Sequence, residues 1–279
     1  MVRTVQLPSG VSVPVIGQGT WKMGEDRKQR EEEVAALRLG LDLGMTLIDT
    51  AEMYGEGGAE EVVGEAIEGR REEVYLVSKV YPHHAGRQGT IAACERSLKR
   101  LRTNRIDLYL LHWRGVYPLA ETVEGFERLK AAGAIRDWGV SNFGLSDMEE
   151  LMTAPDGEKV ATDQVLYNLY HRQIEADLLP WCLNRRLPIM AYSPVEQGRM
   201  ADDPVLEKIA ARYDITPAQA ALAWLLQKEE MIVIPKATKL EHVLENRAAL
   251  EVRLTAGDLK ELDRAFPPRQ GFGPSRWAA

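Results

Sequence analysis

The chain has little cysteine and no long hydrophobic run. Cys94 and Cys182 are the only cysteines among its 279 residues, and both fall in helix-like segments, which argues against a disulfide framework. No apolar stretch approaches the roughly 20 residues that a membrane-spanning helix needs. The opening MVRTVQLPSG lacks the apolar core of a secretory signal. We therefore expect a cytoplasmic protein without membrane association, in which both thiols are packed helix residues.

Basic residues are also fewer than acidic ones. The 35 basic and 42 acidic residues leave a formal net charge of −7, which argues against broad binding of nucleic acid but leaves room for a local basic pocket. No Ser/Gly linker, low-complexity tract or long charge block divides the sequence. We therefore expect a single domain over residues 1–279, which acts as a monomer.

The glycine patterns of the common nucleotide-binding folds are missing. Gly17 and Gly19 begin a G-x-G, but Lys22 stands where the dinucleotide fingerprint needs a third glycine. No G-x-x-x-x-G-K-[ST] phosphate loop occurs either. These absences exclude the doubly wound dinucleotide fold as the interpretation of the α/β pattern.

The sequence does contain eight apolar, β-rich runs, each followed by a helical pattern. Their near-continuous apolar character is typical of strands covered on both faces, as in a parallel sheet. The runs are 15–19, 46–50, 74–80, 107–112, 135–142, 162–168, 188–194 and 231–235. Eight such units in this length predict an α/β fold, a (β/α)₈ TIM barrel. Residues 2–15 predict an N-terminal β-hairpin around Pro8-Ser9-Gly10.

The intervening segments carry apolar residues at helical spacing. One stripe is formed by Ile91, Cys94, Leu98 and Leu101, with Thr90 as the predicted N-cap. A second is formed by Val34, Leu37 and Leu41, with Gly44 as the stop, and a third by Leu240, Val243 and Leu244. More than one helix fits between the last two strands. A further helix at about 255–265 precedes the Pro/Gly-rich tail, so we expect extra C-terminal helices.

Polar side chains follow three consecutive predicted strands. Asp49 ends the second strand, Tyr54 follows in its loop, Lys79 ends the third and His112 the fourth. In a barrel these ends meet at one face, where active sites lie. Each residue alone has an ordinary structural explanation, but together their chemistry is complementary. The four are therefore the candidates for catalysis.

These four groups suggest a proton-transfer site. At about 4 Å a lysine ammonium favours a phenolate by up to roughly 4 kcal/mol at an effective dielectric near 20, which predicts a lowered pKa for Tyr54. Asp49 would keep Lys79 charged, and His112 would orient a substrate oxygen. Such a site protonates the oxyanion that forms when hydride reaches a carbonyl carbon, and it needs no metal.

Three motifs also carry a resemblance to a known family. "GQGTW" (17–21), "LIDTAEMYG" (47–55) and "IPKATKLEHVLEN" (234–246) occur in order on successive strand units. Over nearly its whole length the chain resembles the aldo-keto reductases, most closely the short bacterial members of the methylglyoxal-reductase type. The resemblance implies that Asp49, Tyr54, Lys79 and His112 form the catalytic tetrad, with Tyr54 as general acid in carbonyl reduction.

The resemblance further implies a nicotinamide cofactor. It places the nicotinamide on Ser141, Asn142, Gln164 and Tyr192, and the pyrophosphate near Ser193. Gly19 and Thr20 are further expected cofactor contacts. The resemblance places the adenosine end on a second group: Lys236, Ala237, Thr238, His242, Glu245 and Asn246. NADPH-preferring relatives commonly carry arginine where this chain has His242, and serine where it has Ala237. We expect NADPH because Lys236 is retained, with NADH as an alternative.

The expected substrate is a small-molecule carbonyl. The resemblance lines the substrate pocket with Trp21, Tyr81 and Trp113 beside the tetrad, and aromatic walls suit 2-oxoaldehydes such as methylglyoxal, other reactive ketones and aromatic aldehydes. We expect Trp277 in the tail (267–279) either to cover the substrate or to be disordered. His83 and His84 lack a third ligand and are interpreted as loop residues, so we expect no metal.

Two other functions stay open. A non-catalytic, cofactor-sensing regulatory subunit would use the same fold, and the full tetrad argues against it. A barrel hydrolase would need acids or a histidine cluster at several strand ends. Asp49 is the one clear strand-end acid in the sequence.

Overall fold

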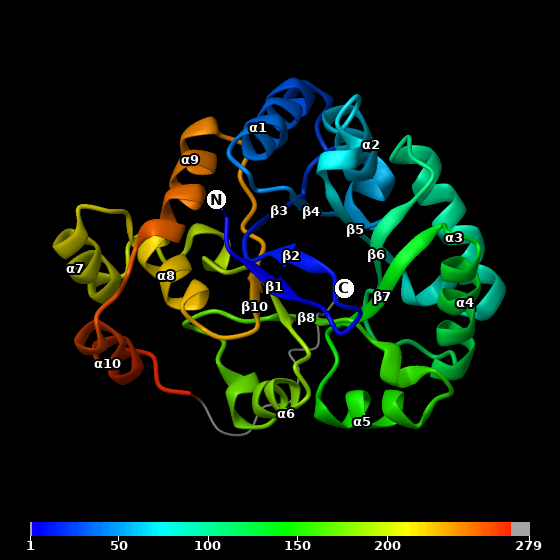
Figure 1. Cartoon of the computed structure of the whole chain (residues 1–279). Helices are drawn as coiled ribbons and strands as arrows, with labels where there is room; N and C mark the ends of the chain where they lie inside the picture. Colours follow the sequence, from blue (N-terminus) through cyan, green and yellow to red (C-terminus); the bar gives the residue numbers. More distant parts are fainter. Residues whose placement is uncertain (1, 269–279) are drawn as a thin grey trace.

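Eight parallel strands form one sheet in the computed structural model, which describes residues 2–268. Their order along the sheet follows the chain without crossover (Figure 1). The strands are β3 (Gly17–Gly19), β4 (Leu47–Asp49), β5 (Tyr75–Val80), β6 (Ile106–Leu111), β7 (Ile135–Ser141), β8 (Asp163–Leu166), β9 (Ile189–Tyr192) and β10 (Met231–Val233). The eight predicted apolar runs are thereby confirmed as strands.

The two ends of the sheet meet. Parallel bridges join Ile16 to Val233 and Gly19 to Lys236. Backbone N–H groups complete the seam, because Val233 donates to the carbonyl of Val15 and Gly19 donates to the carbonyl of Pro235, both at 2.9 Å. The sheet is therefore closed into the predicted (β/α)₈ barrel.

Side-chain alternation along the strands divides the core into an inner and an outer part. Because successive strand residues point to opposite faces, every second residue enters the barrel. The inner cluster contains Leu47, Val77, Leu108, Leu110, Met190 and Ile232. Their neighbours, such as Ile48, Leu76 and Tyr109, belong to the outer cluster beneath the helices.

The predicted hairpin is present at the amino-terminal end of the barrel. Strands β1 (Thr4–Gln6) and β2 (Ser12–Pro14) pair antiparallel and lie across the barrel in Figure 1. Leu7 and Val13 are buried and belong to the inner cluster. The hairpin thus covers the end of the barrel opposite to the carboxyl ends of the strands.

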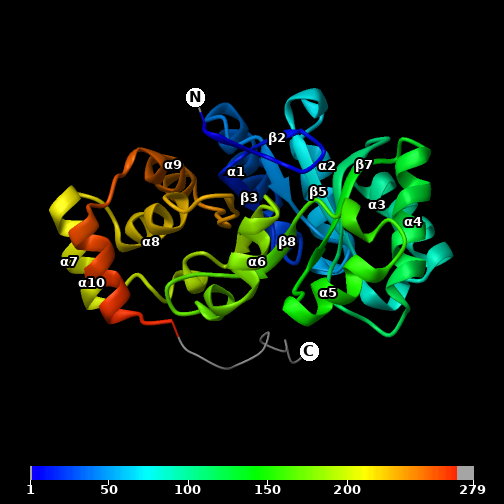
Figure 2. The same ribbon diagram turned by 60° about the horizontal axis from the view of Figure 1, so that its bottom comes forward.

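Ten α-helices surround the barrel within residues 2–268. They are α1 (Arg30–Asp42), α2 (Gly58–Ala66), α3 (Arg87–Arg100), α4 (Leu119–Ala131), α5 (Leu145–Thr153), α6 (Leu178–Asn184), α7 (Pro204–Tyr213), α8 (Pro217–Leu226), α9 (Leu240–Ala248) and α10 (Ala256–Ala265). Helices α7 and α8 both lie between β9 and β10, as predicted. Helices α7, α8 and α10 lie on one side of the barrel, and α7 packs on both α8 and α10 (Figure 2).

Two details of the helix predictions were wrong. Thr90 does not cap its helix, because α3 already begins at Arg87, after Gly86 in extended backbone conformation. The residues Arg87 and Gln88 are polar, so the apolar stripe alone could not show this extra turn. In α9 only Val243 is buried, whereas Leu240 and Leu244 are about half exposed. The predicted helix end at Gly44 is confirmed by its left-handed φ of 85°.

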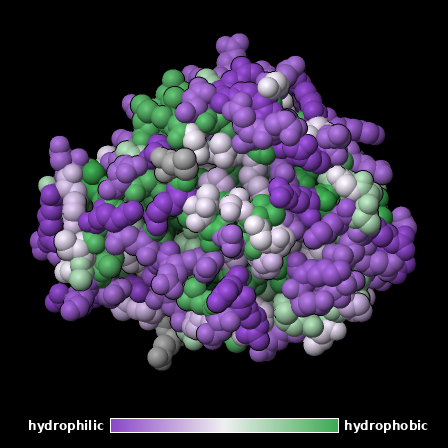
Figure 3. Space-filling view, viewed as in Figure 1, coloured by the Kyte–Doolittle hydropathy of each residue, from purple (hydrophilic) through white to green (hydrophobic). Residues whose placement is uncertain are grey.

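The surface carries mainly polar side chains. Figure 3 shows the hairpin face, where apolar residues appear in small groups between hydrophilic ones. No helix described between residues 2 and 268 is long and apolar enough to cross a bilayer. Cys94 and Cys182 are both buried, in α3 and α6, which confirms that they are packed helix residues.

Candidate active site

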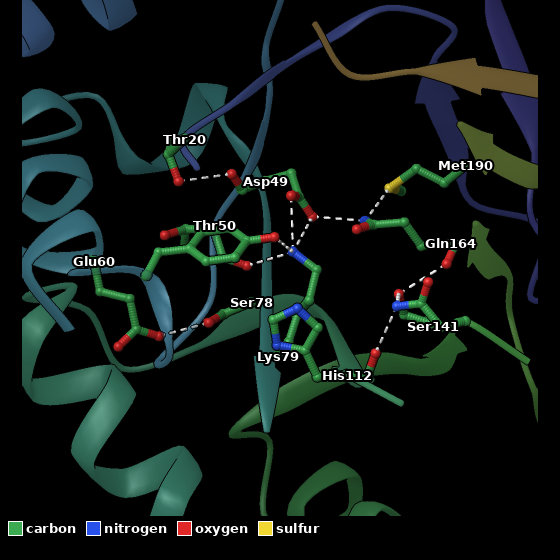
Figure 4. Close-up of polar contacts among 12 residues, drawn as sticks. Thr20, Asp49, Thr50, Glu60, Ser78, Lys79, His112, Ser141, Gln164 and Met190 are labelled. Atoms are coloured by element: carbon green, nitrogen blue, oxygen red, sulfur yellow. Dashed lines mark hydrogen bonds and ion pairs between the residues drawn. The ribbon is translucent and has the colours of Figure 1, made fainter. Parts of the chain in front are cut away.

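A buried ion pair lies at the centre of the site. The Nζ of Lys79 is 2.8 Å from each carboxylate oxygen of Asp49 and 2.8 Å from the backbone carbonyl of Thr50 (Figure 4). Lys79 is fully buried, and Asp49 is 2% exposed. All three acceptors therefore stabilise an ammonium group that has no access to water.

The strand pattern places this pair inside the barrel. Leu47 and Val77 belong to the inner cluster, so Asp49 and Lys79, each two residues further along, point inward as well. Strand β4 pairs with β5 in a register that sets Asp49 opposite Val77. Both side chains therefore emerge at the carboxyl ends of neighbouring strands, where they meet.

Tyr54 reaches the same point from the loop after β4. Its hydroxyl is 3.4 Å from the Nζ of Lys79, which also lies 4.9 Å from the centre of the phenol ring. Directly after it, Gly55, Glu56 and Gly57 adopt left-handed conformations with φ of 56°, 53° and 93°. This turn reverses the chain into α2, and it keeps the phenol over the barrel mouth.

His112 follows β6 and lies beside Tyr54. The two ring centres are 5.6 Å apart in an edge-to-face arrangement. Burial, with a further contribution from the charge of Lys79, holds the pKa of His112 well below its usual range. The imidazole is therefore neutral near pH 7, and it can donate or accept one hydrogen bond at each ring nitrogen.

The predicted direction of the Tyr54 pKa was wrong. Burial raises the pKa of Tyr54 well above its usual range, and the charge of Asp49 adds to this effect. Burial also lowers the pKa of Lys79, although Asp49 opposes that shift. Desolvation of the phenolate outweighs the attraction of Lys79, so the phenol keeps its proton in this site.

The residues predicted for the nicotinamide lie next to the tetrad. Gln164 donates from Nε2 to Oδ1 of Asp49 at 2.7 Å and lies 2.9 Å from the sulfur of Met190. The hydroxyl of Ser141 donates to the backbone carbonyl of Gln164 at 2.8 Å. Asn142 donates to the carbonyl of His112 at 3.0 Å, and its own oxygen accepts from the Tyr192 hydroxyl at 2.7 Å. Side chains from β7, β8 and β9 thus form one network with the tetrad.

The residues predicted for the rest of the cofactor lie along the barrel seam and on α9. Thr20 donates to the backbone carbonyl of Asp49 at 2.9 Å, and Gly19 pairs with Lys236, so β3 connects the seam to the tetrad. Ser193 follows β9 with a φ of 49°. The remaining residues lie between β10 and α9, or on α9 itself: Ala237, Thr238, His242, Glu245 and Asn246. His242 is exposed, with its Nε2 3.8 Å from Glu241.

The predicted substrate residues are aromatic and lie on loops at the same end of the barrel. Trp113 is 5.0 Å from His112 between ring centres, and Tyr81 is 5.1 Å from Trp113. Trp21 follows β3, and the amine of Lys22 lies 4.6 Å from the centre of its ring. The tail from residue 269, with Trp277, lies outside the described residues.

The sequence interpretation missed several partners. It did not anticipate the bond from Gln164 to Asp49, or the role of the Thr50 carbonyl beneath Lys79. It also passed over Glu52, although this residue stands in the quoted motif between Asp49 and Tyr54. His84 pairs with Glu52 at 3.0 Å, and no group of three or more possible metal ligands occurs in the described part of the chain.

The fold and the site together define the class of protein to which the chain belongs. The chain is a (β/α)₈-barrel protein in which an acid, a phenol, an amine and an imidazole meet at the carboxyl ends of β4, β5 and β6. Comparison with known proteins names the family. The profile of the aldo/keto reductase family matches residues 15–266. The chain therefore belongs to the aldo/keto reductase family and is an oxidoreductase, which confirms the resemblance.

Individual relatives are similar over their whole lengths. The methylglyoxal reductase YeaE of Escherichia coli K12 is 53% identical over 96% of each chain. The glyoxal reductase of Bacillus subtilis is 35% identical over 98% of this chain and 95% of its own. An aldo/keto reductase from Klebsiella pneumoniae, crystallised with NADP and acetate, is 52% identical with a TM-score of 0.95, covering 98% of this chain and 99% of that one.

Next to Gln164, the carboxyl group of Asp163 is buried with little compensation. Asp163 is fully buried on β8, and neither of its oxygens has a hydrogen-bond partner of normal geometry among the described residues. Burial raises the pKa of Asp163 well above its usual range, and the backbone N–H of Phe143 offsets this only in part. Because the folded-state pKa is raised, this group's contribution to stability is greatest below about pH 4, and it is lost as the pH rises through the folded pKa.

We predict that Asp163→Asn stabilises the protein more at pH 8 than at pH 5. The amide removes the cost of ionising or protonating a buried carboxyl, which we expect to be worth roughly 1–3 kcal/mol at pH 8. Urea denaturation at both pH values measures the difference. The exposed Asp202→Asn is the control and should show no such pH dependence. An equal effect of Asp163→Asn at both pH values would contradict the prediction.

Proposed function

We propose that the protein reduces small aldehydes and reactive ketones to alcohols with NADPH, and that Tyr54 is the general acid. The observation that carries this proposal is the sharing of the buried Lys79 ammonium between Asp49 and the Tyr54 hydroxyl. The names of the relatives point to 2-oxoaldehydes such as methylglyoxal. The aromatic rings beside His112 support aromatic aldehydes as further substrates.

The side chains near the tetrad suit a nicotinamide. Ser141, Asn142 and Gln164 offer hydroxyl and amide groups, which donate and accept hydrogen bonds as a carboxamide requires. Tyr192 adds a half-buried ring at the end of β9. When bound, NADPH supplies a hydride. Two relatives of known structure were crystallised with NADP and with NADPH, which supports this choice of cofactor.

The tetrad provides the proton that completes the reduction. Neutral His112 donates a hydrogen bond to the carbonyl oxygen and orients it. As the oxygen gains negative charge, the Tyr54 hydroxyl transfers its proton to it, and a phenolate remains. Lys79, 3.4 Å away, stabilises that phenolate, while Asp49 keeps the amine in place. Solvent then returns a proton to Tyr54, so one hydride and one proton yield the alcohol.

We also propose that residues 1–279 act as one domain and as a monomer in the cytoplasm. The support is the undivided sequence and the two free cysteines, Cys94 and Cys182, which suit a reducing compartment.

We predict that Tyr54→Phe lowers turnover by roughly 10²–10⁴-fold without weakening NADPH binding, because only the transferable proton is lost. NADPH oxidation with methylglyoxal and an aromatic aldehyde measures turnover, and quenching of protein fluorescence measures binding. Tyr117→Phe, on an exposed loop, is the matched control. Wild-type turnover by Tyr54→Phe would contradict the mechanism. Tight NADPH binding by the wild type without turnover of any carbonyl would favour a regulatory function instead.

We predict that His242→Arg tightens NADPH binding by roughly tenfold and leaves NADH binding nearly unchanged. A guanidinium makes charged, bidentate hydrogen bonds to a phosphate, which the geometry of an imidazole does not allow. Titration of both cofactors measures the effect. Leu244→Arg adds the same charge on an exposed position of the same helix, and it is the control. If both variants tighten NADPH binding equally, His242 does not lie at the 2′-phosphate.

A further inference from the structure

The carboxylate of Glu52 joins two loops at the carboxyl ends of β4 and β5. Its side chain is 7% exposed, and its Oε1 accepts the backbone N–H of Tyr81 at 2.8 Å. The same oxygen is 3.0 Å from Nδ1 of His84, and Oε2 is 3.5 Å from the guanidinium of Arg96 on α3. The backbone N–H of Glu52 also donates to the carbonyl of Lys79 at 3.4 Å. One nearly buried carboxylate thus holds the loop after β5 against the loop that carries Tyr54.

A chain of aromatic ring contacts runs from Tyr54 to Tyr81, the residue whose backbone the Glu52 carboxylate binds. Tyr54 contacts His112 at 5.6 Å, His112 contacts Trp113 at 5.0 Å, and Trp113 contacts Tyr81 at 5.1 Å between ring centres. The backbone of Tyr81 is bound by Glu52, which lies two residues before Tyr54. These contacts form a closed circuit, in which Glu52 provides the one hydrogen bond to a charged group.

That bond differs in kind from the ring contacts. Aromatic pairs tolerate sliding over a range of offsets, whereas a hydrogen bond from an N–H to a carboxylate is directional and strengthened by charge. Burial shields the Glu52 carboxylate from water, so the bond is not readily exchanged for hydration. Glu52 therefore anchors the backbone of Tyr81, whose ring stacks on His83 at 4.8 Å and contacts Trp113 at 5.1 Å between ring centres.

We propose that Glu52 is a positioning residue that determines affinity for the carbonyl substrate. The inference rests on the proposed function, because it assigns Tyr81 and Trp113 to the substrate side of the site. Glu52 acts through Tyr81, which it binds. The ammonium of Lys79 is held by bonds in which the Glu52 side chain takes no part, and the same is true of the Gln164 amide. Loss of the carboxylate therefore shifts the aromatic wall, while the bonds that hold Lys79, Asp49 and Gln164 stay in place.

The experiment compares Glu52→Ala with Glu52→Gln in NADPH-dependent reduction of methylglyoxal and of benzaldehyde. In Glu52→Ala the KM for benzaldehyde should rise roughly tenfold, because that is the fold-change expected for the loss of a hydrogen bond to a charged group. The kcat should stay within about twofold of the wild-type value. The KM for methylglyoxal should rise less, because a smaller substrate touches less of the wall. Glu52→Gln should restore a KM near that of wild type, since its amide oxygen still accepts the N–H of Tyr81.

Two controls separate positioning from a general loss of structure. Glu95→Gln changes an exposed carboxylate on α3, next to Arg96, and should leave both constants unchanged. The Kd for NADPH should be equal in all variants, whereas a merely structural role would weaken cofactor binding and lower kcat together. If Glu52→Ala does not fold, Glu52→Asp is tested in its place, because its shorter side chain withdraws the carboxylate from the N–H of Tyr81.

The outcomes distinguish the inference from the proposed function. A rise in KM with constant kcat and constant NADPH affinity supports the role of Glu52. Wild-type KM values in Glu52→Ala, or in Glu52→Asp where that variant decides, would overturn the inference while leaving the proposed function intact. A fall in kcat and a weakening of NADPH binding that accompany the rise in KM would also overturn the inference. Failure of the wild type to reduce either carbonyl would overturn the proposed function and this inference with it.

Discussion

The buried ammonium of Lys79 is the constraint on which the site depends. Removing such an ion from water costs several kcal/mol even after relaxation, so its partners must be close and well placed. Asp49 and the carbonyl of Thr50 meet this requirement at 2.8 Å, both from the end of the neighbouring strand β4. Gln164 reaches across from β8 to bind Asp49. The positions of these groups follow from the closure of the barrel, which brings all the strand ends to one mouth.

The same buried charge sets the protonation states around it. It helps to keep His112 neutral, and burial keeps the Tyr54 phenol protonated even though Lys79 lies 3.4 Å away. A raised pKa makes the phenol a weaker acid, so Tyr54 keeps its proton until strong negative charge develops on a neighbouring oxygen. In the proposed mechanism, proton transfer depends on stabilising the phenolate in the transition state, and Lys79 lies 3.4 Å from the hydroxyl.

Much of this arrangement follows from the sequence, because it rests on local patterns. The apolar runs predict the eight strands, and period-2 alternation from Leu47 to Asp49 and from Val77 to Lys79 turns both charged groups inward. Other features depend on tertiary context. The direction of the Tyr54 pKa depends on how deeply the ring is buried, and the start of α3 before Thr90 depends on a polar first turn. Partners of Glu52 come from a loop and a helix more than 25 residues away.

The site divides into two parts that are held by different means. Bonds among strand residues fix Asp49, Lys79 and Gln164, and a strand end cannot shift without breaking the barrel. Tyr81 and Trp113 lie on loops, where ring packing holds both side chains and the Glu52 carboxylate holds the backbone of Tyr81. Loop residues can change without disturbing the strands. Under the proposed function, this division allows the accepted carbonyl to change while the proposed proton transfer stays the same, because different contacts hold the two parts.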